Sequence, residues 1–178
     1  MEHINVYGAL EQVDGRWQLR FRRKLPHSPE KVWRALTEPD HLVAWFPTDI
    51  EGERAAGAPL RFRFREGEAP AIDGEMIRFD PPSVLEFRWG QHETLRFELQ
   101  PDADGCLLTF VNRFDEVGKA ARDAAGWHSC LDALGHHLSG QPAPWTPQER
   151  WRQVHRSYVE RLGHDAATIG PPTSPPGG

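Results

Sequence analysis

The chain has 178 residues, of which 21 are lysine or arginine and 26 are aspartate or glutamate, so its formal net charge at neutral pH is −5. This length predicts one domain with its own core, and the acidic balance argues against a nucleic-acid partner. Two cysteines are too few for a secreted disulfide framework, and no apolar run is long enough to span a membrane or act as a signal segment. We therefore expect a cytoplasmic protein with free thiols.

The first predicted elements are a strand and two short helices. Residues 16–25 alternate between polar and apolar side chains, which predicts a half-buried strand. Ser28-Pro29-Glu30 then supplies an N-cap, a proline for the first helical position and an acid for the first turn, so a helix is predicted from here to Leu36. A second short helix is predicted over 41–46, before Pro47. Together the two helices would form a small lid.

The rest of the chain reads as a meander followed by two long helices. Between 49 and 114, short alternating runs end at Gly, Pro or Asp, which is typical of an antiparallel sheet. Apolar residues then recur at helical spacing over 118–138, and again over 147–162. The apolar stripe of the 147–162 helix must be covered, either within the chain or by a homodimer contact. The Pro/Gly-rich segment after 165 predicts a disordered tail.

Three groups of residues, in this order and at this spacing, carry a resemblance to a known superfamily. They are Pro29-Glu30-Lys31-Val32-Trp33-Arg34-Ala35-Leu36-Thr37-Glu38-Pro39 with Leu42 and Trp45; Gly74-Glu75 and Asp80-Pro81-Pro82 with Leu85 and Trp89; and Gly126-Trp127 with Leu131, Leu134 and Leu138. The chain resembles the helix-grip fold of the SRPBCC (START-like) superfamily, and within it the group similar to the activator of heat-shock-protein-90 ATPase. The resemblance implies an α+β fold in which a curved antiparallel sheet of six to seven strands wraps around a long C-terminal helix.

On this basis the chain divides into an N-terminal extension (1–15), the helix-grip domain (16–140), an additional amphipathic helix (141–164) and a disordered tail (165–178). The chaperone-activating relative carries a separate N-terminal domain for which this chain has no room. We therefore do not expect a chaperone partner.

Members of the superfamily hold hydrophobic ligands between sheet and helix, and strand parity and helical spacing select candidate wall residues here. These are Trp45, Phe62, Phe64, Trp89, Phe97, Phe110, Trp127 and Leu131. The alternative is that these side chains simply fill the core. Arg23, Glu75 and Asn112 share that face and could orient a ligand's polar group or transfer a proton. Alternatively, each could pair with a neighbouring backbone group or reach water at the end of a strand.

Other chemistry has less support in the sequence. His128, Asp132 and His136 are spaced four apart, as metal ligands on one helix face could be, but that face lies opposite the apolar stripe and is predicted to be solvated. The serines lack a Gly-x-Ser-x-Gly elbow, and residues 52–57 lack the lysine of a phosphate-binding loop. We expect neither a metal nor a cofactor.

The sequence supports three functions. The leading hypothesis is that a cavity between sheet and long helix binds a small hydrophobic or amphipathic ligand, with the helices between Trp33 and Trp45 gating entry. The alternatives are a cyclase- or hydrolase-like enzyme that uses the same cavity, and a protein-interaction module.

Overall fold

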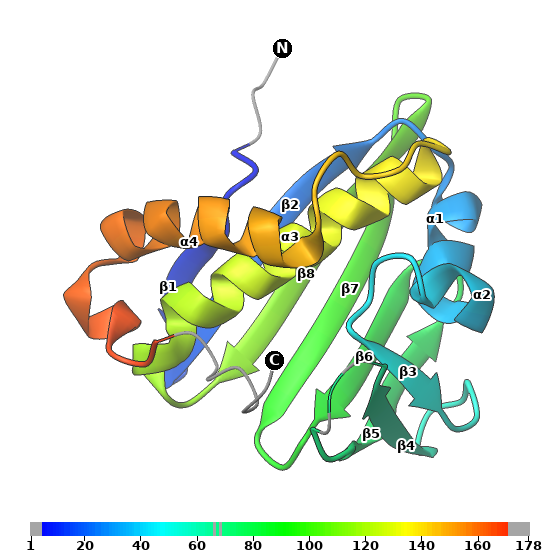
Figure 1. The fold of residues 1–178 in the computed structure, drawn as a ribbon. Coiled ribbons are helices and arrows are strands. Elements are labelled where there is room, and N and C mark those ends of the chain that lie inside the picture. Colours follow the sequence, from blue (N-terminus) through cyan, green and yellow to red (C-terminus); the bar gives the residue numbers. More distant parts are fainter. Residues whose placement is uncertain (1–4, 66, 68, 171–178) are drawn as a thin grey trace.

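A computed structural model describes residues 5–65, 67 and 69–170, which form one open antiparallel sheet and four α-helices (Figure 1). The sheet has the order β1-β2-β8-β7-β6-β5-β4-β3. Its strands are β1 (Ala9–Val13), β2 (Arg16–Leu25), β3 (Thr48–Glu51), β4 (Pro59–Phe64), β5 (Ile72–Asp80), β6 (Val84–Trp89), β7 (Glu93–Asp102) and β8 (Gly105–Phe114). The helices are α1 (Pro29–Thr37), α2 (Pro39–Leu42), α3 (Ala120–Leu138) and α4 (Pro147–Leu162), with 3-10 turns η1 (Val117–Lys119) and η2 (His164–Ala167). The predicted α+β helix-grip architecture is confirmed, with more strands than expected.

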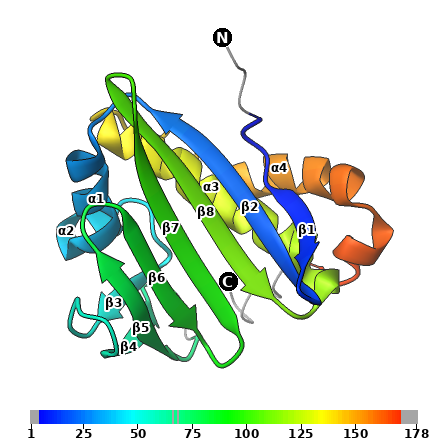
Figure 2. The same ribbon diagram turned by 180° about the vertical axis from the view of Figure 1, so that it is seen from behind.

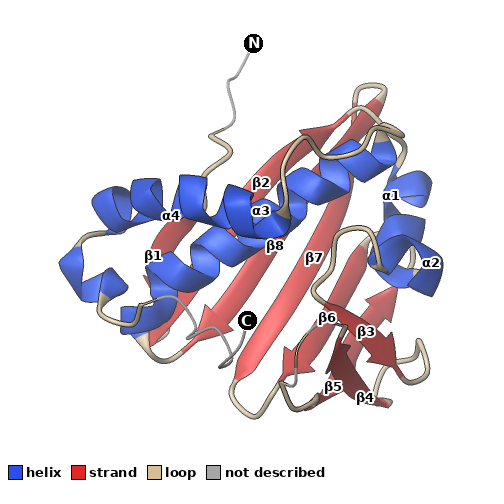
Figure 3. Cartoon of the chain, in the orientation of Figure 1, coloured by secondary structure: helices blue, strands red, loops and turns tan. Residues whose placement is uncertain are grey.

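All the described helices lie on one side of the sheet, and none of the described elements covers its other side, which we call the uncovered face (Figures 2 and 3). Because side chains alternate along a strand, each central strand sends one set toward α3 and the other toward solvent. Phe21, Phe87 and Phe110 point inward and are at most 1% exposed. The uncovered face carries ion pairs between neighbouring strands, such as Arg63 with Glu51 at 2.6 Å.

The start of α1 follows the sequence signals, whereas α2 is displaced from its predicted position. The Ser28 hydroxyl accepts a hydrogen bond from the Lys31 amide at 3.2 Å, and Pro29 opens the helix. The helix predicted over 41–46 instead starts at Pro39, whose fixed φ suits a first helical position, and ends at Leu42. The chain continues in hydrogen-bonded turns to Phe46, whose amide donates to the Leu42 carbonyl at 2.9 Å.

Both ends of the predicted domain are more ordered than the sequence indicated. The segment assigned to an N-terminal extension contains β1, which pairs with β2 and raises the strand count to eight. Its sequence, ALEQV, lacks the alternation that marks the other strands. Within the predicted tail, Ala166 is 1% exposed and the Ile169 amide donates to the Gly118 carbonyl at 3.0 Å. The rest of that tail, 171–178, lies outside the described residues.

Helix α4 packs along α3 and covers a face that we predicted to be solvated (Figure 1). Val154 and Tyr158 of its apolar stripe are 2% and 0% exposed. These two residues are thus covered within the chain, as the intramolecular alternative predicted. The Tyr158 hydroxyl accepts from the Gly8 amide at 2.8 Å and lies 2.8 Å from Nδ1 of His128. His128 is consequently only 1% exposed, and the prediction of a solvated face is wrong there, because α4 lies over it.

The described residues contain no helix that is both long and apolar enough to cross a membrane.

Candidate functional site

The space between α3 and the middle of the sheet is filled by aromatic rings. Phe62, Phe97 and Phe110 are at most 1% exposed. The ring centroids of Phe97 and Phe110 are 4.7 Å apart, as are those of Phe62 and Trp89. These three predicted wall residues therefore form the packed floor of the site rather than the lining of an open cavity.

Above this floor, an open cleft separates α3 from the β4–β6 half of the sheet. It consists of two adjoining hollows of about 460 and 380 Å³, which share Pro47, Phe64 and Cys130. We call this space the aromatic cleft and define it by its main walls, Phe64, Trp89, Trp127 and Trp151. Trp45 lines the larger hollow. Four of the predicted wall residues, Trp45, Phe64, Trp89 and Trp127, are thus brought together around one opening.

The wall residues are held edge to face, so their positions are mutually fixed. The Trp89 and Trp127 rings lie 5.8 Å apart at 72°, and Trp127 contacts Phe110 below at 5.2 Å. The Trp151 indole N–H donates to the Arg122 carbonyl at 3.1 Å, which ties α4 to the rim. Phe64, Trp89, Trp127 and Trp151 are each only partly buried. The cleft therefore presents preorganised aromatic surface to whatever enters it.

One end of the aromatic cleft is charged. Lys119 Nζ lies 2.6 Å from Glu93 Oε2 and 3.7 Å from Asp123 Oδ2, and Arg122 Nε donates to Asp123 Oδ1 at 3.0 Å. Burial raises the pKa of Asp123, and the attraction of Arg122 and Lys119 opposes that shift. Sequence reasoning missed this cluster, because its members come from the start of β7, from η1 and from the first turn of α3.

Asn112 stands behind this cluster. It is fully buried, and its Nδ2 donates to Glu93 Oε1 at 3.2 Å. No partner among the described residues reaches its Oδ1. Asn112 therefore positions Glu93 rather than lining the cleft itself.

Arg23 and Leu131 lie on the opposite side of α3 from the aromatic cleft. Both line a separate groove, and Arg23 bonds Asp132 of α3 at 2.6 Å. In the sheet, Arg23 is opposite Leu108, whereas Asn112 is opposite Leu19. Arg23 and Asn112 therefore do not converge on one ligand.

Glu75 is exposed on the uncovered face of the sheet, so its prediction as a cavity residue is wrong. The sequence interpretation placed it on the same face as Ile77 and Phe79. The pairing register shifts between Met76 and Arg78, and this bulge changes the alternation along β5. Before the bulge, Met76 points inward at 1% exposure, and Glu75 and Ile77 share the solvent face. After it, Phe79 turns inward and packs against the core, so Glu75 and Phe79 lie on opposite faces.

A glycine in α3 leaves the aromatic cleft open. Gly126 lines the smaller hollow, and a Cβ built there would meet no atom within 4 Å. Glycine within a helix costs about 0.5–1 kcal/mol relative to alanine. A larger side chain at this position would project into free space and occupy the cleft.

The lid contacts both the cleft and α3. Residues 43–47, which follow α2, line the larger hollow. His41 Nδ1 lies 2.9 Å from His137 Nε2, and the Trp45 indole N–H donates to the Ala35 carbonyl at 2.8 Å. Of the segment between Trp33 and Trp45, residues 43–45 border the larger hollow. That this segment gates entry stays a prediction.

The two thiols are free, and neither has the character of a nucleophile. Burial raises the pKa of Cys106 to about 11 and that of Cys130 to about 12. Among the described residues, no group of three or more His, Cys, Asp and Glu side chains is arranged to hold a metal ion.

Comparison with known proteins identifies a family and several similar folds. The profile of the family described as activator of Hsp90 ATPase homolog 1-like protein matches residues 26–139. CalU16 from Micromonospora echinospora superposes with a TM-score of 0.69 at 20% identity, over 86% of this chain and 95% of its own. EF2215 from Enterococcus faecalis, a conserved protein of unknown function, gives 0.71 at 22% identity, over 87% and 90%.

DynU16, from the dynemicin biosynthetic locus, gives a TM-score of 0.63 at 26% identity over 70% of this chain and 48% of its own, longer chain. A search of curated proteins finds no significant match.

Proposed function

Because the chain belongs to the family of activator of Hsp90 ATPase homolog 1-like proteins, we propose that it uses the helix-grip fold to bind a small amphipathic molecule in the aromatic cleft. The observation that carries this proposal is the half-buried ring surface of Trp89 and Trp127, which borders a hollow instead of being sealed by protein. The occurrence of DynU16 in a biosynthetic locus is consistent with a small-molecule ligand.

The aromatic walls and the charged end of the cleft would contribute differently to binding. Transfer of apolar ligand surface from water onto the rings would supply most of the affinity, at roughly 25 cal/mol per Å² before entropic costs. The charged end would set orientation, because a ligand hydroxyl or carbonyl placed there can hydrogen-bond to Lys119 or Asp123. An amphipathic ligand, with its apolar part on the rings, satisfies both parts.

A native mass spectrum of the freshly purified protein, compared with its denatured mass, would identify a retained ligand by weight. The decisive test uses a neutral apolar probe, N-phenyl-1-naphthylamine, titrated by fluorescence. We expect saturable binding that Gly126→Met weakens by at least about tenfold, equivalent to roughly 1.4 kcal/mol, since the new side chain fills the cleft. Gly126→Met should not lower the unfolding temperature, because glycine is the poorer helix former.

Gly135→Met is the matched control. Gly135 lies in the same helix as Gly126, and a Cβ there would have equally free space. It faces the separate groove that Arg23 and Leu131 line, on the other side of α3. Phe64→Ala, which removes a wall, should also weaken probe binding, whereas Phe79→Ala, packed on Trp33 outside the cleft, should not. Equal effects of Gly126→Met and Gly135→Met on the probe would rule out the aromatic cleft as its site.

Cyclase-like acid–base chemistry in the same cleft is a second candidate function. It is favoured by Asp123, a carboxyl whose pKa is raised by burial and which lies at the end of the aromatic walls. If the retained ligand is converted on incubation, Asp123→Asn should abolish the conversion, while binding of N-phenyl-1-naphthylamine, which has no hydroxyl or carbonyl group, stays intact. Unchanged conversion by that variant would exclude Asp123 as the acid or base.

A further inference from the structure

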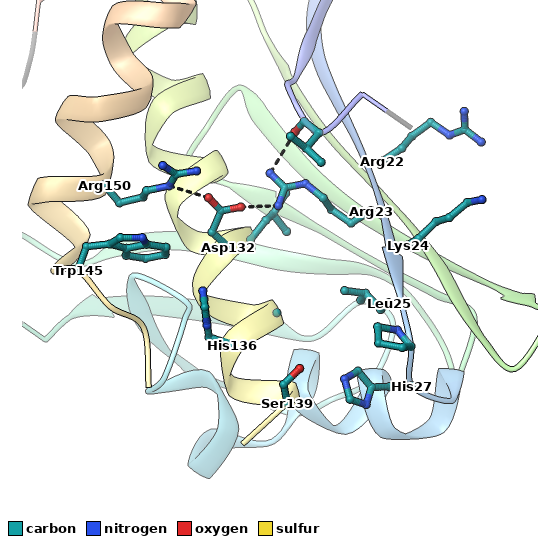
Figure 4. Close-up of a pocket in the computed structure, with 14 residues that line it drawn as sticks. Arg22, Arg23, Lys24, Leu25, His27, Asp132, His136, Ser139, Trp145 and Arg150 are labelled. Carbon is teal, nitrogen blue, oxygen red and sulfur yellow. Dashed lines mark hydrogen bonds and ion pairs between the residues drawn. The ribbon is translucent and has the colours of Figure 1, made fainter. Parts of the chain in front are cut away.

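A second hollow lies on the other side of α3, between that helix and β2 (Figure 4). It has a volume of about 720 Å³, and its walls come from the end of β2, the second half of α3 and the start of α4. We call it the arginine groove and define it by Arg23, His136, Trp145 and Arg150. Trp145 also borders the larger hollow of the aromatic cleft, whereas Arg23, His136 and Arg150 line neither of its hollows.

The centre of the arginine groove has more positive than negative charge. Asp132 is the carboxylate among the described lining residues, and it accepts from Arg23 Nη1 at 2.6 Å and from Arg150 Nε at 2.8 Å. His128 Nε2 approaches the same carboxylate at 3.4 Å. Two guanidinium groups thus share one carboxylate, on a molecule whose net charge is −5. Arg22 and Lys24 stand at the rim, with side chains that extend away from Asp132 (Figure 4).

Asp132 stays ionised in this arrangement, and both of its oxygens are engaged by neighbouring side chains. Burial by itself would raise its pKa, but the hydrogen bond from His128 and the nearby charge of Arg23 lower that pKa well below its usual range. Each of its oxygens already accepts from one guanidinium. The single negative charge of Asp132 is therefore shared by two guanidinium groups, which leaves the groove with a net positive charge.

The groove also has more hydrogen-bond donors than acceptors. Arg23 is 9% exposed, yet its Nε has no acceptor among the described residues, and the same is true of buried Nε2 of His27. Buried polar groups in folded proteins are nearly always paired, so this shortage is uncommon. His136 and the Ser139 hydroxyl add groups that can donate into the groove. An anion would supply the missing acceptors.

An apolar wall accompanies the positive charge. The Trp145 ring is half-buried, with the His136 ring edge-on at 5.5 Å and the Arg150 guanidinium 5.3 Å from its centroid. Leu131 lines the groove near Asp132. Gly135 occupies the α3 side, and a Cβ there would meet nothing within 4 Å. As at Gly126, the absence of a side chain keeps the space open.

We propose that the arginine groove is a second binding site, for a small organic anion whose carboxylate or phosphate lies against Arg23 and Arg150 and whose apolar part lies on Trp145. Charge-assisted hydrogen bonds from a guanidinium suit the planar oxygens of either group. The two sites meet at Trp145, but Arg23, His136 and Arg150, which would hold the anion, line neither hollow of the aromatic cleft. Anion binding here therefore does not depend on the function proposed for the cleft.

The test is calorimetric titration of the full chain with phenyl phosphate and benzoate, with phenol as the neutral control. We expect saturable binding of at least one anion and no binding of phenol. Gly135→Met should abolish the anion signal and leave binding of N-phenyl-1-naphthylamine unchanged, whereas Gly126→Met should do the opposite. Arg150→Gln should weaken anion binding by about tenfold or more, as loss of a charge-assisted contact predicts.

A measurement on the unsubstituted protein guards against variants that fail to fold. In amide and indole proton–nitrogen spectra, phenyl phosphate should shift the Gly135 amide and Trp145 indole signals. It should leave in place the Ala133 amide and Trp127 indole signals, which report on the two hollows of the aromatic cleft. The proposal is overturned if neither anion binds at millimolar concentration, if phenol binds as tightly as the anions, or if the shifts centre on Trp127. Anion binding that survives Gly135→Met would overturn it as well.

Discussion

Tyr158 joins three separate parts of the fold through one hydroxyl group. The hydroxyl accepts from the Gly8 amide ahead of β1, and it lies within hydrogen-bond distance of His128 Nδ1 on α3. Because His128 Nε2 faces the Asp132 carboxylate, the neutral imidazole carries its proton there, and Nδ1 accepts from Tyr158. Burial raises the pKa of Tyr158 far above its ordinary value, so the hydroxyl stays protonated and able to donate.

Removal of this hydroxyl should destabilise the protein. Tyr158→Phe keeps the ring but leaves the Gly8 amide and His128 Nδ1 buried without a partner, so we expect a loss of about 1–3 kcal/mol in the free energy of unfolding. Urea denaturation followed by circular dichroism measures it. The chain's other tyrosine provides the control, since Tyr7→Phe removes a hydroxyl from a half-exposed ring. Equal stability of Tyr158→Phe and the unsubstituted protein would show that water replaces the lost contacts.

Individual site residues were predictable from the sequence only where local alternation held. Trp89 and Trp127 follow the strand and helix periods and lie where those periods place them. Glu75 does not, because the bulge between Met76 and Arg78 puts Phe79 on the opposite face from Glu75, and single-sequence periodicity has no signal for a bulge. His128 was misassigned because the helix period shows which face it occupies but not that a later helix covers that face.

At the scale of elements, α4 borders both the aromatic cleft and the arginine groove. It contributes Trp151 to the rim of the aromatic cleft and Arg150 to the arginine groove. Its start is fixed by a capping box, in which Thr146 Oγ1 accepts from the Glu149 amide at 3.1 Å and Glu149 Oε2 accepts from the Thr146 amide at 2.9 Å. Arg150 and Trp151 therefore lie in the first turns of the helix after this cap.

Thr146→Ala should cost about 1 kcal/mol of unfolding free energy, because the cap loses its side-chain acceptor. It should also weaken ligand binding, since fraying of the first turn moves Arg150. Thermal unfolding and the phenyl phosphate titration measure the two effects, and Thr146→Ser, which keeps the hydroxyl, should restore both. Failure of the serine variant to restore them would assign the loss to the threonine methyl group.

Elements with strong local signals were predicted well, and those stabilised mainly by long-range pairing were not. The caps and prolines of α1 and α4 are local features, and the structure contains both helices where these features occur. Strand β1 has no local signal and forms because β2 offers it a free edge. The start of α2 at Pro39 could have been read from the proline itself.

At the scale of the whole molecule, four buried or partly buried histidines couple stability to pH. Burial lowers the pKa of His27, His128, His137 and His155 below the ordinary value of 6.5. In the unfolded chain these groups take up protons once the pH falls through 6.5, while the folded protein resists protonation. The free energy of unfolding should therefore be greatest above that pH and decrease as the pH falls through and below it.

Urea denaturation at a series of pH values from neutral to mildly acidic tests this expectation. His128→Gln should reduce the slope of stability against pH, whereas His92→Gln, in an exposed turn, should not. A stability that stays constant or rises on acidification would contradict the expectation.

The overall architecture was the most predictable level, because it depends on the order of many elements rather than on one residue. The helix-grip arrangement follows from a meander succeeded by a long amphipathic helix. The arginine groove was not predictable, since it requires β2, α3 and α4 to meet.

The uncovered face of the sheet also affects how copies of the protein behave at high concentration. A broad sheet without a covering layer can stack on another sheet if its side chains are apolar. Here the outward side chains include arginine and glutamate partners such as Arg63 with Glu51 and Arg96 with Glu98. Two such faces could meet only by stripping water from charges, which is costly. The charged side chains of this face therefore disfavour sheet-to-sheet stacking between copies of the protein.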